Sequence, residues 1–214
     1  MSLMPYTLHP SEKLVSLFRE KPWQGCDPSE AQFLFIGLDA NYAPDIEQSL
    51  PEIFDYLASG PDFWRKTDLH HPFRLPHYKG SGKRYHLKFA EIGFGPEHAD
   101  IVSFVELLHL PTMGRSPLTV KDLSTEHIGK LNTVIENGKA KYIFASAQVV
   151  NLMRQSRIFP WLEKSALRKV GSFDVLVEQN GQTIYQMYHF SCYGHQLEVL
   201  NKQIAELRNI VKAI

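Results

Sequence analysis

Residues 32–38 read QFLFIGL, and this short apolar run decides the fold. Its length, its β-branched and aromatic residues and the glycine near its end predict a buried parallel strand rather than a helix. Comparable runs recur at residues 101–105, 141–145 and 184–189. Helical patterns separate these runs, and such alternation predicts an α/β fold. We expect a three-layer sandwich with a central, mostly parallel four-stranded sheet, in which strands 33–38 and 184–189 lie side by side.

The helical patterns have recognisable ends. Ser11 and Ser124 are typical N-cap residues, and Gly138 is a typical stop. A further strand at residues 173–177 is joined to the last strand by the turn Asn180-Gly181. The spacing predicts helices at residues 11–20, 46–58, 84–92, 124–138, 148–155 and 195–213.

Composition narrows the class of protein. The 214 residues suit a single domain over 1–214, and 43% hydrophobic residues can form a sizeable core. Two cysteines, Cys26 and Cys192, are too few for an iron–sulfur cluster or a disulfide framework. No apolar run approaches the ~20 residues of a membrane helix. We therefore expect a cytoplasmic monomer without a membrane partner, metal or cofactor.

A segment rich in proline, histidine and glycine, at about 59–84, is expected as an insertion over one end of the sheet. Residues 69–90 contain basic and aromatic side chains but no acidic residue, although the net charge of the whole chain is zero. Such a segment can grip a nucleic-acid strand through its phosphates. The alternative is a solvated loop without a partner. The cations expected to contact the backbone are Arg74, Lys79, Lys83 and Arg84.

Ligands of open α/β sheets bind outside the carboxyl ends of the strands, so the loops at 38–45, 104–116 and 189–196 matter most. Asp39 follows the first strand and is the leading catalytic candidate, although it could equally cap the next segment. His189 and Ser191 follow the last strand, and a lone histidine there is often structural.

Three other chemistries fit poorly. Residues 80–84 (GSGKR) lack the complete phosphate-loop pattern, because Arg84 stands where serine or threonine is needed. His70, His71 and His77 lack the helical spacing of a zinc site. Cys192 has no evident third partner for nucleophilic catalysis with a histidine.

The segments FIGLDANY, IVSFVELLHLPT and HFSCYGH, in this order, resemble the uracil-DNA glycosylase superfamily. That family opens its site with G-x-D-P-Y or G-x-N-P-G and closes it with H-P-S-P or N-P-S. The resemblance covers roughly residues 30–214 and includes the KYIFAS strand with its following helix. The chain departs from the family by having alanine, phenylalanine and cysteine in place of the motif prolines, at Ala40, Phe190 and Cys192.

The resemblance implies specific roles. Asp39 falls on the water-activating aspartate, and His189 and Ser191 fall on the first and third positions of the closing motif. Ser103 stands where many members have a base-reading asparagine. The resemblance further implies contacts between the substrate and the residues of the opening motif, Gly37, Leu38, Ala40, Asn41 and Tyr42.

The chemistry agrees with these roles, because breaking an N-glycosidic bond builds positive charge on the sugar and negative charge on the base. A carboxylate at Asp39 and a donor at His189 serve these opposite charges. A base in a duplex must be flipped and stacked, for which Tyr42, Phe63 and Tyr85 are candidate platforms. We expect a DNA glycosylase acting on single-stranded or damaged DNA; the alternative is a non-catalytic nucleotide or nucleic-acid binding module.

Overall fold

A computed structural model describes residues 6–114, 117–162 and 165–214. Within these residues the main sheet has seven strands, of which the central four are mutually parallel and the outer three antiparallel to their neighbours. The order is β2 (Trp23–Gly25), β4 (Val102–Glu106), β3 (Phe33–Gly37), β6 (Tyr142–Ala145), β9 (Gln182–Gln186), β8 (Phe173–Gln179) and β7 (Arg168–Val170). The predicted α/β class is confirmed, but the sheet is larger and more mixed than four strands.

One expected neighbour relation is wrong. β3 and β9 do not lie side by side, because β6 pairs with both of them in parallel register. A separate two-stranded sheet joins β1 (Thr7–Leu8) to β5 (Thr112–Met113). β1 and β5 have two residues each, and β2 and β7 have three, too short for an alternation pattern to reveal them.

Most predicted helices are present within a residue or two of their expected bounds. The predicted helix at 46–58 is instead two, because Leu50 leaves the helical conformation and Pro51 precedes the second helix. The helices are α1 (Glu12–Glu20), α2 (Ile46–Ser49), α3 (Glu52–Ala58), α4 (Gly60–Thr67), α5 (Lys83–Ala90), α6 (Thr125–Asn137), α7 (Ala147–Ser156) and α8 (His195–Val211), with short 3-10 turns at Pro72–Arg74, Pro96–His98 and Val120–Asp122.

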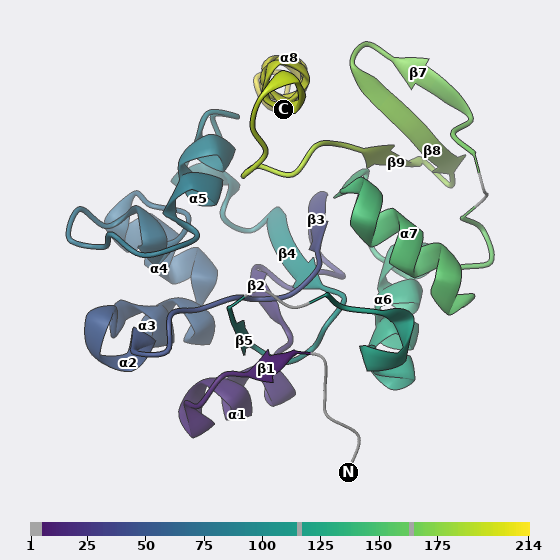
Figure 1. The fold of residues 1–214 in the computed structure, drawn as a ribbon. Helices are drawn as coiled ribbons and strands as arrows, with labels where there is room; N and C mark the ends of the chain where they lie inside the picture. Colours follow the sequence, from purple (N-terminus) through teal and green to yellow (C-terminus); the bar gives the residue numbers. More distant parts are fainter. Residues whose placement is uncertain (1–5, 115–116, 163–164) are drawn as a thin grey trace.

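Helices cover both faces of the sheet (Figure 1). Successive side chains of a strand point to opposite faces, so Leu34 and Ile36 pack against α6 and α7. Phe33 and Phe35 pack on the other face, in a ring-rich core completed by α5 and α8. A third apolar cluster joins α1, α2 and α3 beside this core. The sheet is thus buried on both sides, and its strand ends are left to carry polar chemistry.

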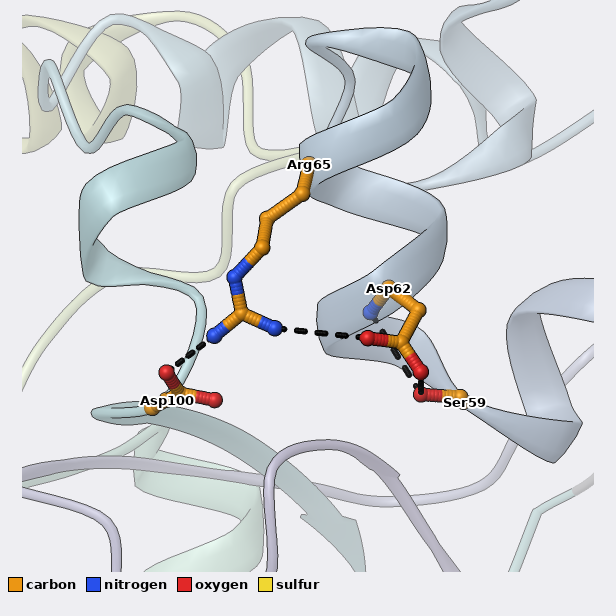
Figure 2. A network of polar contacts seen from close by, with 4 residues as sticks. All are labelled: Ser59, Asp62, Arg65 and Asp100. Carbon is orange, nitrogen blue, oxygen red and sulfur yellow. Dashed lines mark hydrogen bonds and ion pairs between the residues drawn. The ribbon is translucent and has the colours of Figure 1, made fainter.

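The expected insertion at 59–84 contains α4 and the 3-10 turn at Pro72–Arg74, and it ends in the first residues of α5. Ser59 caps α4 by accepting a hydrogen bond from the backbone N–H of Asp62, and its hydroxyl donates to the Asp62 carboxylate at 2.6 Å. Arg65, one turn later, forms ion pairs with Asp62 and with Asp100, which lies just before β4 (Figure 2). These contacts fix α4 against the start of a central strand.

Candidate functional site

Three strand ends converge at the carboxyl edge of the sheet, on the face covered by α5 and α8. Gly37, the last residue of β3, pairs in register with Glu106, the last residue of β4. The chain stays extended beyond β3, where the carbonyl of Ala40 accepts from the N–H of Thr112 at 2.9 Å. Asp39 therefore lies two residues beyond Gly37, on the same side of the extended chain.

Asp39 is half-buried and is held by a neighbouring hydroxyl. The Thr112 hydroxyl donates a hydrogen bond to Oδ2 of Asp39 and accepts one from the side-chain amide of Asn41 at 3.1 Å. The same amide donates to the carbonyl of Gly114 at 2.5 Å. Thr112 is completely buried, so this network is rigid. Among the described residues, Oδ1 of Asp39 has no hydrogen-bond partner, and it can accept from a bound molecule.

Glu106 places a second carboxyl group beside Asp39. A side chain on Gly37 would overlap this carboxyl, so the glycine provides the space that Glu106 occupies. Burial, followed by the charge of Asp39, raises the pKa of Glu106 to about 8. At neutral pH Glu106 therefore keeps its proton.

His189 follows β9 and reaches the same edge. Its Nδ1 accepts a hydrogen bond from the backbone N–H of Ser191 at 3.2 Å, so the neutral ring carries its proton on Nε2. The side chain reaches the surface, yet the surrounding protein lowers its pKa, and the charge of Asp39 opposes that shift. His189 is thus a neutral hydrogen-bond donor at the edge that also carries Asp39.

Only one of the three expected stacking residues lies at this edge. The ring of Tyr85 lies 5.2 Å from that of His189 and 4.9 Å from that of Phe190. Tyr42 and Phe63 are core residues, 3% and 6% exposed, within the cluster formed by α1 to α3. Their apolar packing overrides the predicted role in stacking a base.

The structure contradicts the base-reading role expected for Ser103. This residue is fully buried inside β4, three positions before Glu106, and its hydroxyl donates to the carbonyl of Cys26 at 2.9 Å. It ties β4 to the segment after β2. Leu38 and Ala40 contribute main-chain pairing, to Leu108 and to the β5 strand respectively.

The basic segment is used mainly inside the protein. Lys83 donates to the carbonyls of Leu75 and Tyr78, at 3.3 and 2.6 Å. Arg84 donates to the carbonyl of Cys192 at 2.9 Å, which joins α5 to the loop after β9. Arg74 is partly buried, whereas Lys79 is exposed. Lys83 and Arg84, two of the four cations expected to contact phosphates, thus use part of their hydrogen-bonding capacity on carbonyl groups of the chain.

Three histidines of this segment lie in the core beneath the edge. Nε2 of His70 and Nδ1 of His86 share a hydrogen bond of 3.1 Å, and the ring of His71 stacks on that of His86 at 3.7 Å. Nε2 of His71 contacts Oε1 of Gln24 at 3.2 Å. Burial lowers the pKa of all three histidines, and that of His86 falls to about 3. They are neutral packing residues. Across residues 6–114, 117–162 and 165–214, no three histidine, cysteine or acidic side chains are grouped to hold a metal ion.

Two surface hollows lie elsewhere. One, of about 460 Å³, lies beside β2 and the start of α4 and is lined partly by Lys21, Cys26 and Asp100. The other, of about 300 Å³, lies between α1 and α6 and includes His109 and His127. None of Asp39, Glu106 and His189 lines either hollow. Among the described helices, none combines the length and apolar character needed to cross a bilayer.

Sequence reasoning named Asp39 and His189, which lie at this edge, but it did not name their neighbours Glu106 and Thr112. Both lie in the 104–116 region that was expected to border the site. Glu106 is the only charged residue in the run IVSFVELLHL, and a lone charge at the end of an apolar strand could have identified it. Thr112 carries no comparable sequence pattern.

No family model matches the chain, and no curated protein matches it either.

Proposed function

We propose that the chain is a divergent member of the uracil-DNA glycosylase superfamily, with that family's three-layer sandwich around a parallel four-stranded core. In this proposal it hydrolyses the N-glycosidic bond of a damaged base flipped out of DNA. The observation that carries the proposal is the shared position of Asp39 and His189 at one edge, with opposite electrostatic character.

The two residues suit the two halves of the reaction. Oδ1 of Asp39 is available to accept a proton from water, while the Asp39 charge stabilises the positive charge that develops on the sugar. The Nε2–H of neutral His189 can donate to the base as it acquires negative charge. Thr112 holds the carboxylate in a fixed orientation, which reduces the reorganisation needed during the reaction.

Two features support a nucleic-acid substrate. Tyr85 presents a ring beside His189, where an extrahelical base could stack. Lys79 is an exposed cation in the turn before α5. Since Lys83 and Arg84 are engaged with carbonyls, we propose fewer phosphate contacts than the charge of the segment alone indicates.

A second candidate is a non-catalytic module that binds a nucleotide or a nucleic-acid end. The burial of Ser103 favours it, because the position implied for base recognition cannot contact a ligand. The presence of a carboxylate with a free oxygen favours the enzyme instead.

The test is release of free base from single-stranded and duplex oligonucleotides containing uracil, hypoxanthine or an alkylated base. We expect release by the wild-type protein and a loss of at least 100-fold in Asp39→Asn, which keeps the shape of the side chain but not its charge. Asp45→Asn, at an exposed position in the following loop, is the matched control. Binding of these oligonucleotides without any base release would favour the module, and neither binding nor release would reject both candidates.

A further inference from the structure

The side chain of Glu106 lies at the same edge of the sheet as Asp39 and is partly exposed. It ends β4, opposite Gly37, and its carboxyl rests against the bare face of that glycine. Behind the strand, Nε2 of His127 contacts the carbonyl of Glu106 at 2.8 Å and fixes the main chain. The carboxyl therefore has a defined position next to Asp39, on a central strand.

This carboxyl has no ion pair or hydrogen bond among the described residues. The groups that interact with it electrostatically are Asp39 on the extension of β3, Tyr42 beyond it, Tyr56 on α3 and Tyr85 on α5. None of these is a cation. Burial of Glu106, followed by the charge of Asp39, explains why its pKa lies near 8.

We propose that Glu106 is the general acid of the reaction, and that it delivers its proton to the departing base while Asp39 activates water. This inference rests on the proposed function. Two neighbouring carboxyl groups, of which one keeps its proton at neutral pH, form the usual acid and base pair of glycoside hydrolysis. His189 then donates a hydrogen bond to the base without giving up its proton.

The step balances without a further reactant. The bond between the sugar carbon and the base nitrogen breaks, its electron pair goes to the base, and the proton of Glu106 neutralises that charge. Water adds its oxygen to the sugar carbon and gives a proton to Asp39. A proton then passes from Asp39 through solvent to Glu106, which restores both groups. The products are free neutral base and a sugar hydroxyl.

An acid of this kind assigns a substrate class: bases that leave poorly as anions and depart faster when protonated. It also predicts which base needs Glu106 least. An acidic base such as 5-fluorouracil already leaves well as an anion, so protonation contributes less to its release than to the release of uracil.

The experiment compares wild type, Glu106→Gln and the exposed control Glu12→Gln on oligonucleotides carrying uracil or 5-fluorouracil. General acids typically contribute 10²–10⁴-fold. We expect Glu106→Gln to slow uracil release by at least about 100-fold. The factor by which it slows 5-fluorouracil release should be at least tenfold smaller. The wild-type rate should fall above about pH 8, as Glu106 loses its proton, and the Glu106→Gln variant should lack this decline.

Three outcomes are decisive. Equal slowing of both bases, or a high-pH decline retained in Glu106→Gln, overturns the acid role while the proposed function stands. Absence of base release by wild type on any substrate overturns both. If Glu106→Gln does not fold, carbon-13 NMR of the wild-type carboxyl decides: a resonance already ionised at pH 7 overturns the inference, and a protonated one with the expected wild-type pH profile supports it.

Discussion

The buried histidine cluster should make the stability of this protein steeply dependent on pH. His70, His71 and His86 are 2%, 1% and 9% exposed, and burial lowers the pKa of each from 6.5, with His86 reaching about 3. Arg74 adds to the shifts of His70 and His86. In the unfolded chain each histidine takes up a proton below about pH 6.5 that the native ring refuses. The protein therefore has its full free energy of unfolding above about pH 6.5, as far as these histidines are concerned, and loses part of it as the pH falls.

The magnitude follows from counting protons. Each histidine lowers the free energy of unfolding by about 1.4 kcal/mol for every pH unit below 6.5, as long as the pH stays above the pKa of that histidine in the native state. Glu106 acts in the opposite direction between its native pKa of about 8 and its ordinary 4.5, because the native state binds the extra proton there. These four groups together give a net of two protons, or a loss of about 2.7 kcal/mol per pH unit between about pH 6 and 5, and the lowered pKa values of His109, His127 and His189 add to this loss. The free energy of unfolding of a domain is typically only about 5–15 kcal/mol, so acid unfolding should begin between about pH 6 and 5.

Urea unfolding at pH 7.5, 6.0, 5.5 and 5.0, followed by circular dichroism, measures this slope. His86→Phe keeps an aromatic ring against His71 and should reduce the slope by about one proton, or 1.4 kcal/mol per pH unit. His195→Gln, at an exposed histidine on α8, controls for the loss of a histidine as such. A slope below one proton in the wild type, or an unchanged slope in His86→Phe, would refute the reasoning.

Three further predictions follow from single contacts. Thr112→Val removes the hydroxyl that holds Asp39 and should lower the rate of base release tenfold or more at unchanged substrate affinity, with recovery in Thr112→Ser, measured by single-turnover kinetics. Gly37→Ala introduces a methyl group into the space of Glu106 and should destabilise the fold by about 1–3 kcal/mol in urea titrations; an unchanged midpoint would contradict this packing. Arg84→Ala breaks the bond from α5 to the loop after β9, so hydrogen exchange at residues 189–194 should accelerate while the unfolding midpoint changes little; unaltered exchange would show that this bond is unimportant.

The central elements of the fold could be predicted because strong local patterns coincide with burial. The run at residues 32–38 became β3, and Ser124 and Gly138 bound α6 as expected. β2 and β7 could not be predicted in the same way, since each has three residues and β7 is fully exposed. Their pairing depends on the neighbouring strand rather than on their own pattern.

The site was partly predictable for a related reason. Asp39 and His189 follow two strands of the parallel core, and the edge where parallel strands end is defined by topology. The base-reading role was wrongly assigned to Ser103 because the order of sequence motifs does not give the register of the strands. In the structure, Glu106 rather than Ser103 lies opposite Gly37. Charge patterns likewise could not reveal that Lys83 donates to backbone carbonyls and does not face solvent freely.

The central claim is that Asp39 stabilises positive charge on the sugar of a nucleic acid, and a pair of abasic analogues tests it most directly. One oligonucleotide carries a cationic pyrrolidine in place of the sugar, and its partner carries a neutral tetrahydrofuran of the same shape. The account predicts that wild type binds the cationic analogue at least tenfold more tightly in the presence of free base, and that Asp39→Asn loses this preference. Equal affinity of the wild-type protein for the two analogues would contradict it.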